Sequence, residues 1–148
     1  MAEQRYPLDM NYGGCYVPGV TVFRGTAKQG YRLIDDPWET NIIAVPALSN
    51  PNTYIDAQGK DRLRESDIVI TLNKIRTIFN IARINNQRNL VLTAWGCGAY
   101  QNPAEEIAIL FRTVLIEEGY AKYFNRIIFS IMNTNENYRI FYSILNCL

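Results

Sequence analysis

Residues 92–103 read Leu-Thr-Ala-Trp-Gly-Cys-Gly-Ala-Tyr-Gln-Asn-Pro, and this stretch decides how the fold is interpreted. The preceding apolar run, Leu90-Val-Leu92, is typical of a strand, and the two glycines predict a loop whose backbone can approach a ligand closely. The final Asn-Pro predicts a helix start, with the asparagine as the capping acceptor and the proline in the first helical position. Proteins with α/β folds use a strand, a glycine loop and a helix start of this kind to bind anions.

Apolar patterning on both sides of the loop predicts alternating helices and strands. Apolar residues at spacings of three and four predict helices over residues 66–86, 103–119 and 138–145. Apolar runs predict buried strands at residues 41–45, 90–92 and 126–131. A hairpin is predicted from the two short segments 20–23 and 31–34, and a loop is expected over residues 46–64. The fold class predicted is α/β: one domain, 1–148, with a mixed, mostly parallel sheet covered by helices.

Composition narrows the classes of function. The 148 residues suit one domain, and 48% hydrophobic with 20% charged residues is typical of a folded globular protein. A formal net charge of +1 with scattered basic residues gives no reason to expect sequence-specific nucleic-acid binding. Histidine is absent, which removes Ser–His and Cys–His nucleophile pairs and histidine-ligated zinc. Neither a metal nor a cofactor is expected.

The chain start and the cysteines bear on location. The start MAEQRYPLDM lacks the apolar core of a signal peptide, and no apolar run approaches the roughly 20 residues of a membrane span. The chain has an odd number of cysteines, and the three lie far apart in the sequence: Cys15, Cys97 and Cys147. This favours reduced thiols over disulfides. A cytoplasmic or nuclear protein without a membrane partner is expected.

Two interpretations of the glycine loop follow from the residues alone. Loop amides and the first helical turn converge on an anion-sized space, provided that Glu105 and Glu106 turn outward. The alternative is a tight turn without a ligand. Tyr100 either covers a sugar ring or seals the top of the sheet. Cys97 is expected to be a small packing residue, because no histidine activates it as a nucleophile.

The string from Thr93 to Pro103 resembles the signature loop of the microbial-type poly(ADP-ribose) glycohydrolases, a branch of the macrodomain superfamily. Residues 6–8, 13–16 and 17–24 resemble that family's segment ahead of an early strand, and Ile43-Ala-Val-Pro-Ala47 resembles the strand whose end borders the ligand cleft. The order and spacing agree, and the resemblance covers nearly the whole chain. It implies a macrodomain-like fold with a cleft for ADP-ribose or ADP-ribosylated protein.

The resemblance also implies roles for individual residues. Tyr100 packs by the distal ribose, and Asn102 fixes the helix start. Phe129 and Tyr138 are weaker candidates for the adenine side, for which ordinary packing is the preferred interpretation. The diphosphate is held by the loop residues Gly96, Cys97, Gly98 and Ala99.

The departure from the family concerns catalysis. Catalytic members carry a Gly-Gly-Gly stretch and a following Gln-Glu-Glu ahead of the region matched here, and neither Glu105-Glu106 nor Glu117-Glu118 occupies the matching place. Both later pairs are expected on solvated helix faces. Glycosidic cleavage needs a placed carboxyl group, so an N-terminally truncated, catalytically silent binding module is expected, with no catalytic residue assigned.

Two alternatives stay open. One is a poly(ADP-ribose) glycohydrolase or ADP-ribosyl hydrolase, either as the C-terminal part of a longer enzyme or with an acid from Asp35, Asp36 or Glu39. The other is structural. A truncated macrodomain uncovers a sheet edge or an apolar face, through which the chain pairs with itself or with a partner that supplies the missing elements.

Overall fold

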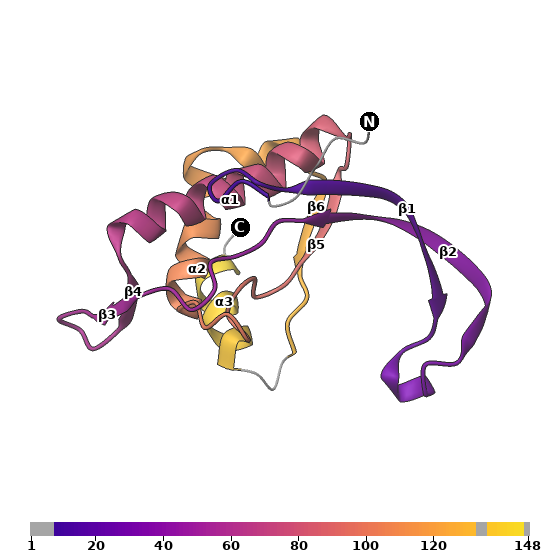
Figure 1. Cartoon of the computed structure of the whole chain (residues 1–148), viewed down its shortest axis with the longest axis horizontal. Coiled ribbons are helices and arrows are strands. Elements are labelled where there is room, and N and C mark those ends of the chain that lie inside the picture. The colour runs from indigo at the N-terminus through magenta and orange to yellow at the C-terminus, as the bar shows by residue number, and fades with distance from the viewer. Residues whose placement is uncertain (1–7, 133–135, 147–148) are drawn as a thin grey trace.

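The computed structural model describes residues 8–132 and 136–146, so Tyr6, Pro7 and Cys147 lie outside the described residues. The α-helices are α1 (Glu65–Ile84), α2 (Ala104–Arg112) and α3 (Glu136–Leu145) (Figure 1). A π-helical turn, Thr113–Glu117, continues α2, and short 3-10 turns lie at Ala27–Gln29 and Tyr120–Tyr123. The strands are β1 (Cys15–Arg24), β2 (Leu33–Ala44), β3 (Thr53–Ile55), β4 (Asp61–Leu63), β5 (Asn89–Leu92) and β6 (Arg126–Phe129).

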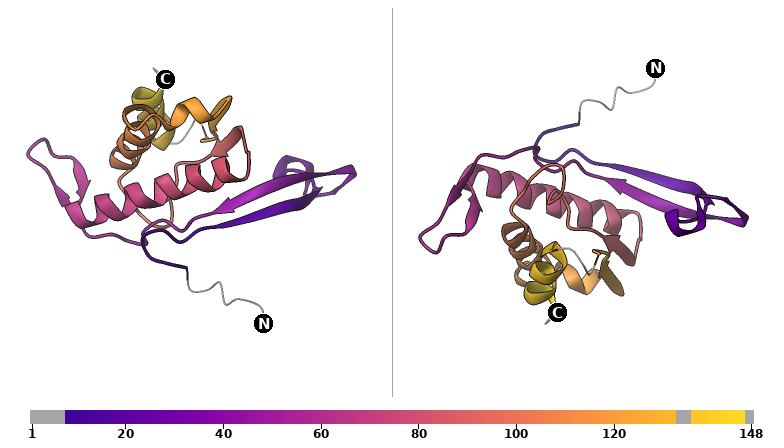
Figure 2. Two further views of the ribbon diagram at one scale, coloured as in Figure 1. Left: turned by 90° about the horizontal axis from the view of Figure 1, so that it is seen from above. Right: turned by 90° about the horizontal axis from the view of Figure 1, so that it is seen from below.

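The described strands form three two-stranded sheets. The long antiparallel hairpin β1–β2 extends away from the helices, and the small hairpin β3–β4 projects at the other end of α1 (Figures 1 and 2). The strands β5 and β6 pair in parallel. The expectation of a mixed α/β fold is confirmed, but one pair of strands is parallel and the strands do not join into a single sheet.

The predicted helix faces form the core. The inner side of α1 buries Ile75, Phe79 and Ala82. The helix α2 and its π-helical continuation bury Ile107, Leu110, Phe111, Val114 and Leu115. Phe79 meets Phe111 edge-on, with ring centroids 6.2 Å apart. Aromatic pairs in this geometry add stability beyond that of the area they bury, so the contact stabilises the packing of α1 against α2.

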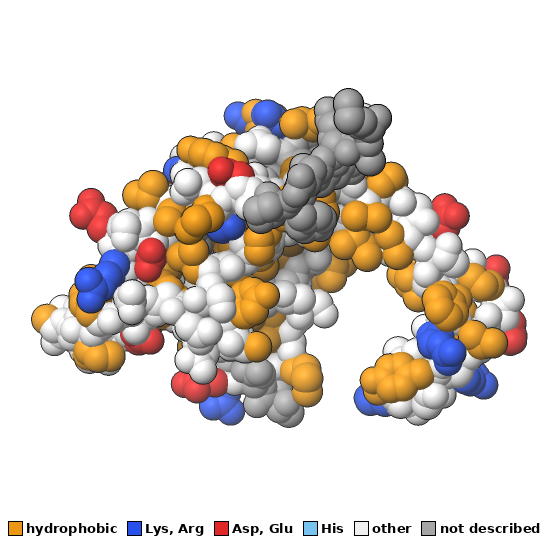
Figure 3. Space-filling model, viewed as in Figure 1, with side chains coloured by type: hydrophobic (Ala, Val, Ile, Leu, Met, Phe, Trp, Pro, Cys, Tyr) orange, Lys and Arg blue, Asp and Glu red, His pale blue; other side chains and the backbone are white. Residues whose placement is uncertain are grey.

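The expectation that the strands are buried on both faces is wrong. Leu90 is 8% exposed, but its neighbour Val91 is 71% exposed, and Ile42 and Ile128 are each 44% exposed. The helices cover one face of these strands and leave the other open. Figure 3 shows hydrophobic side chains at the surface along the β1–β2 hairpin.

Residues 46–64 are not the plain loop expected, because they contain the hairpin β3–β4. The Oδ1 atom of Asp56 accepts hydrogen bonds from the backbone N–H groups of Gln58 and Lys60, both at 2.9 Å, and so organises the hairpin turn. Leu63 at the end of β4 is fully buried. Two three-residue strands are too short to leave an alternating pattern in the sequence.

Candidate functional site: the loop between β5 and α2

The loop after β5 needs glycine at one of its two glycine positions. Gly96 has a φ of +78°, and a Cβ atom there would lie 2.8 Å from both the Ala47 Cβ and the Asn102 Nδ2. The left-handed backbone and the close approach of two segments both exclude a larger residue. At Gly98, by contrast, a Cβ would meet no atom within 4 Å, so this position faces open space.

Asn102 holds the loop together, but it does not cap the helix as expected. Its Nδ2 donates hydrogen bonds to the carbonyl oxygens of Leu48 (2.8 Å), Gly96 (3.0 Å) and Tyr100 (3.3 Å). The N-cap position of α2 belongs to Pro103, and no side chain caps the helix. The buried Oδ1 of Asn102 has no hydrogen-bond partner among the described residues. The prediction of a capping acceptor is therefore wrong, because the amide group turns its nitrogen toward the loop carbonyls.

Several backbone N–H groups of the loop donate no hydrogen bond to any of the described residues. The Cys97 N–H donates to Ala94 O at 3.0 Å, and the Asn102 N–H donates to Gly96 O at 3.0 Å. Four other N–H groups have no acceptor within residues 8–132 and 136–146: those of Gly96, Gly98, Ala99 and Tyr100. Successive amides of this kind form a concave site that attracts anions.

Burial disfavours the thiolate form of Cys97. Burial raises the pKa of its thiol to about 12, and its Sγ lies 3.5 Å from the Trp95 carbonyl oxygen. The thiolate is the nucleophilic form, so a thiol with this pKa does not react at neutral pH. The geometry agrees with the expected packing role.

A groove of about 1150 Å³ begins beside the loop and runs between β2 and β5. Its walls are formed by residues 39–47 on one side and 89–93 on the other, and Trp95, Gly96 and Tyr100 close the end at the loop. Tyr100 is 45% exposed there. Of the six predicted ligand-binding residues, Gly96 and Tyr100 line this groove, while Cys97, Gly98, Ala99 and Asn102 do not.

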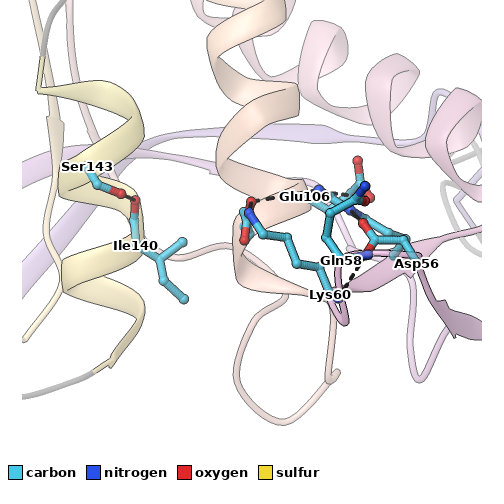
Figure 4. Close-up of polar contacts among 8 residues, drawn as sticks. Asp56, Gln58, Lys60, Glu106, Ile140 and Ser143 are labelled. Atoms are coloured by element: carbon cyan, nitrogen blue, oxygen red, sulfur yellow. Dashed lines mark hydrogen bonds and ion pairs between the residues drawn. The ribbon is translucent and has the colours of Figure 1, made fainter.

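The acidic residues at the start of α2 turn away from the loop. Glu105 forms an ion pair with Lys60, and Glu106 lies 3.7 Å from an Nη atom of Arg62 (Figure 4). Arg62 also donates from Nε to Asp56 at 2.9 Å, so hairpin β3–β4 supplies the cations that neutralise these carboxylates. Glu106 is 8% exposed, which corrects the expectation of a solvated pair. The hairpin cations had no signal in the sequence, because the contact spans more than 40 residues.

Solved structures of bacterial poly(ADP-ribose) glycohydrolases match the fold of this chain. The poly(ADP-ribose) glycohydrolase from Deinococcus radiodurans in complex with ADP-ribose matches 93% of this chain with a TM-score of 0.72 and 28% identity. The fold of this chain is poly(ADP-ribose) glycohydrolase-like. The enzyme from Thermomonospora curvata matches with a TM-score of 0.75 and 28% identity, and its complex with the inhibitor ADP-HPD with a TM-score of 0.71 and 27% identity.

The glycohydrolase-like chain spans about half the length of these structures: 55% of the Deinococcus chain and 49% of the Thermomonospora chain. Its fold is thus glycohydrolase-like and macrodomain-like over about half the length of those structures. No protein-family model and no curated protein sequence matched the chain.

Of the remaining candidate residues, one lines the groove and the others lie outside it. Glu39 lines the groove, whereas Asp35 and Asp36 lie on β2 outside it. Phe129 packs in the core, with its ring centroid 5.2 Å from that of Phe111. Tyr138 stacks on Tyr142 of α3, with centroids 5.8 Å apart. Both aromatic residues are thus engaged in packing, the interpretation preferred for them, and neither lines the groove.

Two searches of the described residues were negative. In residues 8–132 and 136–146, no group of three or more His, Cys, Asp or Glu side chains is arranged to hold a metal ion. None of the helices in those ranges combines the length and hydropathy needed to cross a bilayer.

Proposed function

We propose that this chain is an ADP-ribose-binding module in which the loop Gly96–Tyr100 holds the diphosphate. The observation that carries the proposal is the set of four loop N–H groups without an acceptor among the described residues, at the carboxyl end of β5. Ligands of open α/β sheets bind at such ends, and backbone amides there favour negative charge. Similar glycohydrolases of known structure hold ADP-ribose or ADP-HPD, which supports this choice of ligand, free or attached to protein.

Calorimetry tests the proposal directly. Titration of ADP-ribose into the 148-residue chain is expected to give saturable heat, whereas adenosine, which lacks the diphosphate, gives little. A thermal shift assay with both compounds provides an independent readout. No heat and no thermal shift with ADP-ribose at millimolar concentration would contradict the proposal.

Substitutions at Gly98 test ligand binding without disturbing the fold. A methyl group at this position meets no protein atom within 4 Å, so Gly98→Ala is expected to keep the melting temperature. The added methyl group occupies the open space beside the loop amides, and we expect about tenfold weaker ADP-ribose binding, equivalent to about 1.4 kcal/mol. Gly98→Val should weaken binding further.

The matched control is Ser143→Ala on α3. The Ser143 hydroxyl donates to the Ile140 carbonyl within its own helix at 2.8 Å (Figure 4), and Ser143 is not among the residues that line the groove. Its removal is expected to leave ADP-ribose affinity unchanged. If the wild type and both Gly98 variants bound ADP-ribose with equal affinity, the result would contradict the proposal that this loop holds the diphosphate.

The proposed module binds without cleaving. Glu39 is the one carboxylate from the described residues that lines the groove, and it lies on the far side of Asn41 from the loop. Glu105 and Glu106 are engaged with Lys60 and Arg62. Glycoside cleavage needs a carboxyl group at the scissile bond, which none of these supplies at the loop.

The alternative is a poly(ADP-ribose) glycohydrolase or ADP-ribosyl hydrolase, as part of a longer enzyme or through an acid of this chain. The discriminating assay measures release of ADP-ribose from a modified protein by the wild type and by Glu39→Gln. We expect no release from either. Release by the wild type that is lost in Glu39→Gln would establish the hydrolase instead.

A further inference from the structure

Four cationic side chains that are scattered in the sequence meet at the end of the β5–β6 pair opposite the glycine loop. The register pairs Asn89 with Arg126, so both parallel strands begin here, whereas the loop follows the carboxyl end of β5. All four side chains are exposed, and together we call them the basic cluster. Its members are Arg83 in the last turn of α1, Arg88 just before β5, Lys122 in the 3-10 turn Tyr120–Tyr123, and Arg126 at the start of β6.

Tyr123 lies at the centre of the basic cluster. The guanidinium carbon of Arg83 lies 5.0 Å from the centroid of the Tyr123 ring, and the Lys122 Nζ lies 5.1 Å from it. Arg88 donates from Nη1 to the Tyr123 carbonyl oxygen at 2.8 Å, and the Arg88 carbonyl oxygen accepts from the Arg126 N–H at 3.3 Å. Because an aromatic face attracts cations, the ring helps to hold two of these charges close together.

No carboxylate of the described residues neutralises the basic cluster. None of its four cations forms an ion pair within residues 8–132 and 136–146. The sequence has no Asp or Glu in residues 68–104 or 119–135, the two stretches that contain the cluster. Just before the second stretch, Glu117 pairs with Arg112 and Glu118 pairs with Arg76. The chain as a whole has a net charge of +1, so this surface is a local excess of positive charge.

We propose that the basic cluster binds the phosphate backbone of a single-stranded nucleic acid. Neighbouring cations of one sign raise the local concentration of anions, and an unneutralised basic surface is the usual footprint of nucleic-acid binding. Three of the four cations are arginines, whose planar guanidinium groups bind phosphate oxygens through two parallel hydrogen bonds. Because contacts to the backbone carry no sequence information, binding without sequence preference is expected.

The compact arrangement of the cations favours a flexible strand. They surround Tyr123 instead of forming a row, and a single strand can bend so that successive phosphates reach them. A duplex is stiff over this length and is usually read by an element that enters one of its grooves. A membrane surface fits less well, because binding there requires a broad apolar face beside the cations. Within residues 83–88 and 122–126, Ile84 is the one large hydrophobic side chain that is strongly exposed.

Fluorescence anisotropy of the 148-residue chain with a labelled oligothymidine of about 20 nucleotides tests the proposal. We expect saturable binding at about 50 mM salt, and a slope of about −3 for log affinity against log salt concentration, because each phosphate contact to a single strand contributes about −0.7. The inference does not depend on the proposed ADP-ribose site, so an excess of ADP-ribose should leave the oligothymidine affinity unchanged.

Three outcomes would overturn the proposal. Absence of saturable binding would remove the nucleic acid as a ligand, and sedimentation of the chain with anionic phospholipid vesicles in its place would identify a membrane surface. Tighter binding to a duplex of the same length would contradict the assignment to a single strand. Displacement of the oligothymidine by ADP-ribose would move its site from the basic cluster to the glycine loop.

Matched double substitutions locate the site. Lys122→Gln with Arg126→Gln removes two charges from the basic cluster, and we expect at least about tenfold weaker oligothymidine binding and a salt slope of about −1.5. The control, Lys28→Gln with Arg32→Gln, removes the same two residue types from the far end of the β1–β2 hairpin, where both are exposed (Figure 1). It should bind like the wild type, and circular dichroism verifies that both variants fold. Equal weakening by the two pairs, or by neither, would overturn the assignment of the surface.

Discussion

Asn102 connects three carbonyl oxygens of two segments through one amide nitrogen, so the loop shape depends on a side chain rather than on the glycines alone. We predict that Asn102→Ala lowers the free energy of unfolding by about 1–3 kcal/mol, because buried acceptors lose their donor. Asn102→Asp should be worse, because it places a carboxylate against the same carbonyls. Urea denaturation measures both, and wild-type stability in Asn102→Asp would contradict the hydrogen-bond assignment.

Cys97 provides a test that does not depend on any ligand. With a thiol pKa of about 12, about one molecule in ten thousand carries the thiolate at pH 8. We predict that iodoacetamide at pH 8 leaves Cys97 unmodified in the folded protein and modifies it after denaturation. Peptide mass mapping distinguishes it from the other cysteines. Rapid labelling in the native state would show that the thiol is activated rather than inert.

Sequence patterns predict some residue roles and miss others for a physical reason. The need for glycine at position 96 is local, since it arises from a φ of +78° within the loop. The role of Asn102 is not local, since the choice between its amide oxygen and nitrogen depends on Leu48, 54 residues earlier. A capping motif and a loop clamp look the same in sequence, and the tertiary partner decides between them.

At the scale of elements, hairpin β3–β4 controls the charge at the start of α2. We predict that Arg62→Met lowers the free energy of unfolding by about 1–3 kcal/mol, because Glu106 is buried beside this guanidinium and would lose its cation. ADP-ribose binding should weaken as well, because uncompensated carboxylates at the helix start disfavour an anion. Denaturation and calorimetry measure the two effects. An Arg62→Met protein with full stability would show that the ion pairs contribute nothing.

The ion pair between α1 and the turn after α2 gives a pH dependence. Arg76 binds the Glu118 carboxylate through two hydrogen bonds of 2.8 and 2.7 Å, which lowers the pKa of Glu118 below its usual 4.5. A lowered pKa in the folded state stabilises the protein above pH 4.5, and this contribution is lost as the pH falls through the lowered pKa.

Glu118→Gln is therefore predicted to cost up to about 1 kcal/mol at pH 7 and to approach the wild type at low pH. Urea denaturation of both proteins across the acid range measures this difference. Glu117→Gln serves as the control, because Glu117 is 57% exposed and pairs with Arg112 at 3.1 Å. A Glu118 effect that does not change between neutral and acid pH would rule out the electrostatic origin.

Element prediction succeeded where one pattern ran over several turns. The α1 and α2 stripes were predicted because a helix of this length repeats its buried face many times. The long strand β1 was expected as four residues, 20–23, because Pro18 and Gly19 indicate irregular structure. The hairpin absorbs both residues in an irregularity of register between Val17 and Val20, which no periodicity reveals.

At the scale of the whole molecule, the apolar strand patterns predicted a sheet covered by helices on both faces. In the described residues, the helices cover only one face of the strands. Val91 and Ile128 belong to apolar runs that are typical of strands buried on both faces, but they are 71% and 44% exposed. An apolar run shows that a strand carries apolar side chains on both faces, whereas the tertiary structure decides which face is covered.

The extended hairpin and the helical core should also differ in stability. Near the body, Ile43 packs on the core, but farther out Phe23 and Trp38 are more than half exposed, and the outer hairpin contacts little besides itself (Figure 2). An isolated two-stranded hairpin is marginally stable, so we predict that amides around Val22 and Trp38 exchange with solvent through local opening. Amides of α1 around Phe79 should open only with global unfolding and exchange at least about 10³-fold more slowly.

Hydrogen exchange at increasing urea concentration measures this difference. Exchange of α1 amides should accelerate steeply with urea, because global unfolding exposes much surface, whereas exchange in the outer hairpin should hardly change. The residues nearest the groove, such as Ile43, serve as the internal reference, since they belong to the same strand as Trp38 but pack against the core. If Trp38 and Phe79 showed the same urea dependence, the hairpin would unfold together with the helices as one cooperative unit, and its exposed arm would have to be stabilised by contacts other than those of the described chain.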